Sequence, residues 1–188
     1  MALLPPVAPG IVSQKFGPTT VAHEPAMYHN VADTLAAYAK DYALPSYSAQ
    51  FHPALDIEAP AGAQIRASEA GTVVFAGPDI YSGNSLKVQV QIRPGVWYCS
   101  NHCASIGVKV GQKVTRGQII AHVGSTGWSS GPHDHFWVGI VVSVSGVLKM
   151  HFYDPGLFMA KGTYARSAFP SYAGASGALA TDPRIQPL

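Results

Sequence analysis

The chain has 188 residues, which is enough for one domain with a hydrophobic core. Apolar residues make up 47% of it and charged residues 12%, a balance that excludes a disordered chain. The formal net charge of +2 is too small to indicate nucleic-acid binding, and no apolar run approaches the length of a membrane span.

Three segments precede the regular part of the chain. Residues 1–10 lack the basic start and the apolar stretch of a signal peptide, so they predict an irregular lead-in. A short strand ending in glycine follows over 11–17. The segment 18–50 contains the predicted helix: Asn30 can cap it, its apolar residues recur at helical spacing, and Pro45 ends it.

From residue 64 apolar and polar residues alternate, which is typical of strands. We predict strands over 64–67, 72–76, 86–92, 96–103, 113–115, 119–123, 135–144 and 147–152. The segment 161–188 is rich in Ala, Gly, Ser and Pro, and we interpret it as a linker or a loosely ordered tail. The predicted domain therefore covers 11–160 and is β-rich, with a helical insertion over 18–50.

The two cysteines, Cys99 and Cys103, lie four residues apart. On an extended strand they point to one face but are too far apart for an easy disulfide. A zinc site built on them would need two further soft ligands, which we do not find. We expect two reduced, half-buried thiols.

Four of the eight histidines carry the clearest chemistry. His52 precedes Asp56 by four residues, His102 lies near the end of the strand predicted over 96–103, and His133 and His135 form a His-x-His pair. Zinc prefers neutral imidazole and carboxylate ligands, and a catalytic site keeps one position open for water. In a strand, both rings of His-x-His project to one face. One ring can then bind a metal while the other transfers protons or stabilises an oxyanion.

Each motif alone has an ordinary explanation. A His-x-His pair in a strand is more often partly exposed than bound to metal, and a turn or a cap also produces His-x-x-x-Asp. The residues by themselves therefore leave a hydrolytic zinc site and a structural role both open. Trp128 is interpreted as a loop aromatic that packs on substrate or anchors its loop. The other histidines are interpreted as surface or strand residues: His23, His29, His122 and His151.

The order of the motifs resembles that of the lysostaphin/LytM-type zinc endopeptidases, which cleave bacterial peptidoglycan. The similarity runs in order over roughly residues 11–160 and includes both candidate metal motifs. The matching segments are 12–17, 52–62, 71–77, 101–106, 110–119, 124–127, 130–136 and 153–155.

This resemblance implies roles for single residues. His52, Asp56 and His135 would hold one zinc ion per chain. His102 and His133 would position and activate the attacking water and steady the tetrahedral intermediate.

The resemblance also implies a mainly β fold, an antiparallel barrel-sandwich hybrid with one inserted helix. The implied substrate is a peptide cross-link of bacterial peptidoglycan. We expect a monomer with no nucleic-acid or membrane partner. The insertion over 18–50 would form one wall of the substrate groove, so bond specificity is the feature that transfers least.

Three positions depart from the family pattern. Asp134 stands where Leu or Val is usual, and on a strand it points away from the metal, so we expect a structural role. Cys103 replaces a usual Leu, and Trp137 stands where Glu or Gln is common. None of these departures removes a ligand.

Without a signal peptide, such an enzyme fits a phage or prophage protein. It would be an endolysin released from the host cytoplasm through a holin, a tail-associated lysin, or one module of a larger lysin. The alternative is a non-catalytic relative that binds the wall or activates other hydrolases, but such relatives lose ligands that this chain keeps. Residues 108–120 also resemble half of a biotinyl or lipoyl carrier domain, without the lysine that carries the cofactor.

Overall fold

The computed structural model describes residues 2–18, 51–144 and 147–160. The helix predicted after Asn30 and the tail predicted over 161–188 lie outside these residues. Residues 2–10 form no strand, and two of their apolar side chains belong to the core. Leu3 and Val7 are buried at 2% and 1% exposure, and Leu3 forms an isolated bridge with Met159.

The described residues form strands joined by short turns. The strands are β1 (Ile11–Gln14), β2 (Gly17–Pro18), β3 (Phe51–His52), β4 (Leu55–Glu58), β5 (Gln64–Arg66), β6 (Gly71–Asp79), β7 (Ser85–Arg93), β8 (Val96–Asn101), β9 (Ser105–Ile106), β10 (Lys113–Val114), β11 (Ile119–His122), β12 (His133–Val144) and β13 (Val147–Tyr153). Two 3-10 turns accompany them, η1 (Ile80–Ser82) and η2 (Pro155–Leu157).

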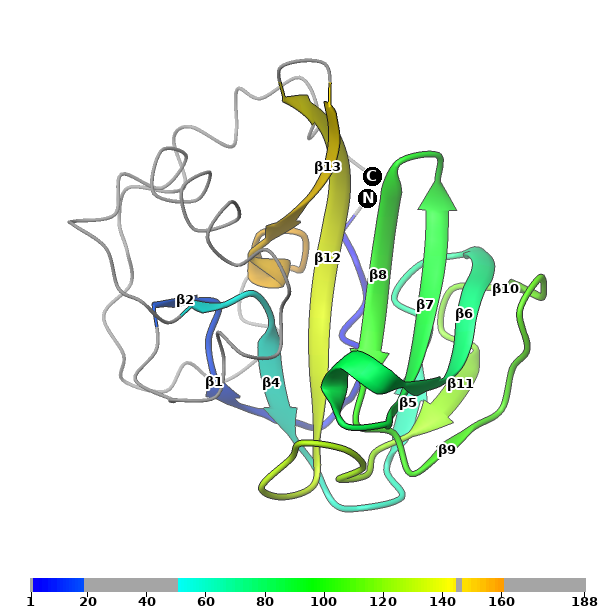
Figure 1. Cartoon of the computed structure of the whole chain (residues 1–188). Helices are drawn as coiled ribbons and strands as arrows, with labels where there is room; N and C mark the ends of the chain where they lie inside the picture. The colour runs from blue at the N-terminus through cyan, green and yellow to red at the C-terminus, as the bar shows by residue number, and fades with distance from the viewer. Residues whose placement is uncertain (1, 19–50, 145–146, 161–188) are drawn as a thin grey trace.

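Most strands belong to one antiparallel sheet with the order β1-β4-β12-β8-β7-β6-β10 (Figure 1). The second half of β12, from Val138 to Val144, also pairs with β13. A second sheet has the order β5-β11-β9, and β2 pairs with β3. The prediction of a mainly β, antiparallel fold is confirmed, with sheets that stay open. No helix of the described residues is long and apolar enough to cross a membrane.

The main core cluster takes its residues from both larger sheets. Ile65 of β5 and Ile120 of β11 pack in one cluster with Val88, Val90 and Phe136 of the large sheet, and all five are fully buried. In β7 the alternation of buried Val88 and Val90 with less buried neighbours is the period-two pattern that predicted the strand.

Strand boundaries differ from the prediction where burial overrides alternation. β4 was not predicted, because Leu55, Asp56 and Ile57 are all buried and leave no period of two. β12 begins at His133 rather than at His135, and β8 ends at Asn101, two residues before the predicted end.

Candidate active site

Three adjacent elements bring His52, Asp56 and His135 together. His52 ends β3, Asp56 lies in β4, and His135 lies in β12, where antiparallel pairing sets it directly opposite Asp56. The Nε2 atom of His52 lies 3.2 Å from Asp56 Oδ1 and 3.2 Å from His135 Nδ1, and the last two atoms are 2.9 Å apart. Three ligand-type atoms from two distant parts of the chain therefore converge on one point.

The backbone orients the ring of His52. Its Nδ1 lies 3.0 Å from the carbonyl oxygen of Lys15, so a neutral ring donates its Nδ1–H there and presents the lone pair of Nε2 to the site. His52 is fully buried and His135 is 4% exposed, so their rings have little room to turn away.

The Asp56 carboxylate is nearly buried, at 9% exposure. Burial alone would raise its pKa, but the attraction of His52 and the hydrogen bonds from His135 and His52 together hold the pKa well below its usual value. Asp56 is therefore a carboxylate at neutral pH.

His102 reaches the same place from the loop after β8. Its backbone has φ 62°, a left-handed conformation that is uncommon outside glycine. The Ser85 hydroxyl accepts the His102 backbone N–H at 2.8 Å and also lies 3.2 Å from its Nδ1. The Thr126 carbonyl lies 2.8 Å from the same Nδ1, so this nitrogen donates a proton and Nε2 keeps a lone pair.

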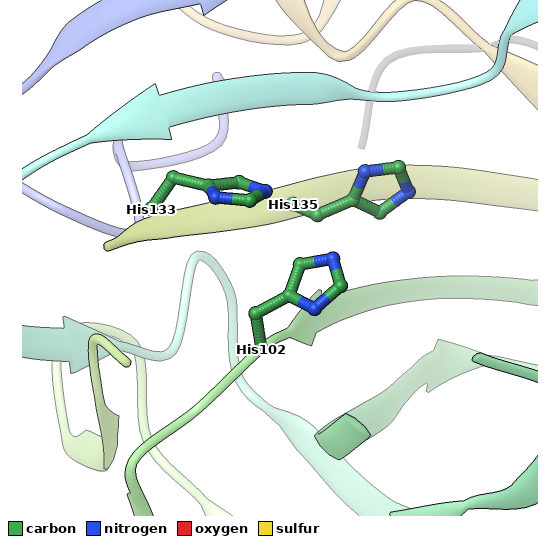
Figure 2. Close-up of side chains that lie close together, drawn as sticks. All are labelled: His102, His133 and His135. Carbon is green, nitrogen blue, oxygen red and sulfur yellow. The ribbon is translucent and has the colours of Figure 1, made fainter. Parts of the chain in front are cut away.

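The rings of His102 and His133 lie against each other beside the three converging residues. Their centroids are 4.7 Å apart, and the centroids of His102 and His135 are 5.8 Å apart (Figure 2). The Gly131 carbonyl lies 2.9 Å from His133 Nδ1, and His133 Nε2 lies 3.7 Å from Asp56 Oδ1.

Burial and the neighbouring rings of His135 and His133 lower the pKa of His102 to about 4, against weaker opposing contacts that include the Thr126 carbonyl. His102 is therefore neutral at neutral pH.

The loop over 124–132 holds the Thr126 carbonyl in place. The Thr126 hydroxyl donates to the Cys103 carbonyl and accepts the Leu86 N–H, both at 2.9 Å. Gly127 follows with φ 72°, and a Cβ there would lie 2.3 Å from the Ser82 carbonyl oxygen. Trp128 of the same loop packs on Gly83, which follows the η1 turn, and stays 53% exposed. It therefore anchors the loop with one face and leaves another in solvent.

A groove of about 700 Å³ opens beside the converging residues. Its described lining comes from the first strand, the Asp56 strand and the 130–133 loop: Pro9, Gly10, Ile11, Ser13, Gln14, Asp56, Glu58, Ala59, Pro60, Ser130, Gly131, Pro132 and His133. An extended chain laid in this groove would pass next to Asp56 and His133.

Asp134 occupies the opposite face of β12, as expected for a residue between two that point to the site. It is fully buried, accepts a hydrogen bond from Ser100 Oγ at 3.1 Å, and has one oxygen without a partner among the described residues. Burial raises the pKa of Asp134 well above its usual value, against the opposing hydrogen bond from Ser100.

The two cysteines are unpaired, as predicted, but they are fully rather than half buried. Cys99 Sγ donates to Asn101 Oδ1 at 3.1 Å, and Cys103 Sγ lies 3.6 Å from the Ser100 carbonyl. Burial raises the pKa of both thiols, so neither is a thiolate at neutral pH.

All five site residues predicted from the sequence lie in this one cluster. The structure corrects one detail, because His102 follows strand β8 instead of belonging to it. The supporting groups were not predicted. Ser85 stands just before the predicted strand 86–92 and carries no signal of its own, and the carbonyls of Lys15, Thr126 and Gly131 carry no signal of residue type.

Comparison with known protein families decides the family. The model of peptidase family M23 matches residues 50–143, which is half of the chain. The chain belongs to peptidase family M23. The matched region contains every residue of the histidine and aspartate cluster.

The chain is similar in sequence to a protein that is named as an endopeptidase. The glycyl-glycine endopeptidase ALE-1 of Staphylococcus capitis is 35% identical over 124 residues, which cover 62% of this chain and 33% of that protein. The chain thus spans about a third of this relative.

Two solved structures of peptidases have the same fold as this chain. Lysostaphin of Staphylococcus simulans superposes with a TM-score of 0.50 and 29% identity, covering 62% of this chain and 50% of that one. A zinc-containing peptidase of Vibrio cholerae superposes with a TM-score of 0.55 and 25% identity, covering 82% of this chain and 39% of that one.

Proposed function

We propose that this M23 protein is a zinc endopeptidase that hydrolyses peptide cross-links of bacterial peptidoglycan. The observation that carries the proposal is the convergence of His52 Nε2, Asp56 Oδ1 and His135 Nδ1 within 2.9–3.2 Å of one another. Its support from relatives is the glycyl-glycine endopeptidase activity named for ALE-1 and the zinc named for the Vibrio cholerae structure.

Two groups of three side chains in the described residues could hold a metal, and they share His135. One is His52, Asp56 and His135, and the other is His102, His133 and His135. Zinc–nitrogen bonds of about 2.0–2.1 Å give a tetrahedron with edges of about 3.3 Å. The spacing of the first group fits this edge, and its carboxylate supplies a negative charge. We therefore assign the ion to His52, Asp56 and His135.

Bound there, zinc would polarise a scissile carbonyl and lower the pKa of a water molecule. His102 and His133 are the neighbouring bases. Hydrogen bonds of their Nδ1 atoms to backbone carbonyls leave Nε2 of each neutral ring able to take a proton from water and deliver it to the leaving amine. With its pKa near 4, the His102 ring is neutral at neutral pH, so its Nε2 keeps the lone pair that a proton acceptor needs.

The assignment is tested by zinc content and wall digestion measured on the same preparations. We expect about one zinc per wild-type chain, and loss of both zinc and digestion in His135→Ala. His102→Ala should keep zinc and digest at least about 100-fold more slowly, because general acid–base catalysis contributes that much. His122→Ala is the matched control, since His122 lies in β11 and, among the contacts described, its ring bonds only Ser105.

A wild-type protein without zinc, or a His135→Ala variant that digests walls normally, would contradict the proposal. A protein that binds zinc and walls but releases no fragments would instead be the non-catalytic relative.

The biological setting stays a prediction. A phage or prophage lysin, alone or as a module of a larger protein, is encoded next to other phage genes. Sequencing the neighbourhood of the gene and the reading frame beyond residue 188 tests this.

A further inference from the structure

One carboxylate in the groove has no part in the site described so far. Glu58 ends β4, its side chain is exposed, and it lines the groove with Asp56 and His133. Among the described residues, none forms a hydrogen bond or ion pair with this carboxylate.

Sheet pairing fixes where Glu58 lies. It is the register partner of Ile11 in β1 and of His133 in β12, while Asp56 is the partner of His135. Asp56 and Glu58 are two residues apart on one strand, so they share a face and are separated by roughly 7 Å along it. An extended peptide has the same rise per residue. Glu58 thus lies about two peptide residues from the reacting group beside Asp56.

The charge of the groove is one-sided. Its described lining contains no lysine or arginine, and Asp56 and Glu58 are its two carboxylates. A divalent cation held by His52, Asp56 and His135 would leave that end net positive. Glu58 would then be the group able to attract a positive charge on the substrate and to repel a negative one.

We propose that Glu58 forms a subsite for a positively charged amino group of the wall peptide, near the bond that is cut. The subsite rests on the proposed function, which it deepens by naming the substrate class: peptides with a free ammonium group about two residues from the cleavage point.

The test compares purified peptidoglycan before and after its free amino groups are acetylated with acetic anhydride, which removes their charge. Zinc-loaded wild type, Glu58→Gln and Glu58→Lys are compared. Glu69→Gln is a control for the same loss of charge, because Glu69 pairs with Arg116 and does not line the groove. Fragment release gives the rate. Co-sedimentation of His102→Ala, alone or with Glu58→Gln, gives binding with little cutting, because this variant is expected to keep zinc.

We expect acetylation to slow wild type and Glu69→Gln about two- to fivefold, the size of an exposed ion pair. Glu58→Gln should digest both walls at the lower rate, and Glu58→Lys should prefer the acetylated wall. The wild-type preference should shrink as salt is raised.

Fragment release with the same preference in wild type and Glu58→Gln would overturn the subsite and leave the proposed function standing. If no wall is cut but Glu58-dependent binding to the native wall remains, the proposed function fails. Glu58 then still binds the ammonium group of the wall, but its place next to a cleaved bond is overturned.

Discussion

Replacing Ser85 by alanine should separate the support of His102 from the metal ligands. The Ser85 hydroxyl is fully buried and accepts the His102 backbone N–H at 2.8 Å, so Ser85→Ala leaves a buried N–H without this partner. Such a loss lowers the free energy of unfolding by about 1–3 kcal/mol. In a domain of this size each kcal/mol lost lowers Tm by roughly 2–4 °C.

The chain offers a matched control for this change. Ser105 contacts Nδ1 of His122 at 3.1 Å, much as Ser85 contacts Nδ1 of His102 at 3.2 Å, and both pairs are separated by 17 residues. The Ser105 pair is exposed, so Ser105→Ala should change the free energy of unfolding by no more than about 0.5 kcal/mol. Urea unfolding in EDTA, followed by tryptophan fluorescence, measures both variants without a contribution from metal.

A second measurement tests whether Ser85 positions the His102 ring. Zinc content should be unchanged in Ser85→Ala, since Ser85 contacts none of the three assigned ligands. Wall digestion should fall by about 10- to 100-fold in kcat, as expected when a catalytic group is misplaced by a fraction of an ångström to one ångström. Equal stability of Ser85→Ala and Ser105→Ala would refute the hydrogen-bond reasoning, and an unchanged kcat would refute the positioning role.

Three further changes have expected outcomes. Gly127→Ala should destabilise by about 2 kcal/mol or more in urea unfolding, because its Cβ would lie 2.3 Å from Ser82 O at φ 72°. Gly62→Ala, at φ 84° with open space around the new Cβ, should lower the free energy of unfolding by only about 1 kcal/mol. Equal losses of stability in the two glycine variants would contradict a clash at Gly127. The pKa of Asp134 is raised in the native state, which therefore keeps the proton to a higher pH than the unfolded state does. The free energy of unfolding then falls as pH rises above the pKa of the unfolded state. Asp134→Asn should therefore gain stability relative to wild type between pH 4 and 8, and a constant difference would argue against this. His102 has a lowered pKa of about 4, so the unfolded state binds its proton first and metal-free stability should fall as pH drops from about 6.5 to 4. His102→Gln should flatten that part of the pH curve, and an unchanged slope would contradict the assignment.

The candidate site residues could be named from the sequence because their types and spacing are visible there and the order of their motifs resembles a family pattern. His133 and His135 share a face of one strand at a spacing of two, and the four-residue spacing of His52 and Asp56 matched a family pattern. That His135 lies opposite Asp56, across 79 residues of chain, depends on strand pairing. Local spacing contains no information on such pairing.

Strand existence was similarly easier to predict than strand ends. The β7 strand shows alternation because its two faces differ in burial, whereas β4 is enclosed between β1 and β12 and shows none. His102 was assigned to a strand because its left-handed backbone conformation is set by contacts with Ser85 and Thr126, which lie 17 and 24 residues away.

The sequence by itself determined the β architecture and the five polar side chains of the site, because alternation and residue type are local properties. Only the tertiary structure decided which nitrogen of each ring faces the site, since that depends on the carbonyls of Lys15, Thr126 and Gly131. It also decided that Glu58 lies in the groove, because the face of a strand acquires a function only when neighbouring strands and loops enclose it.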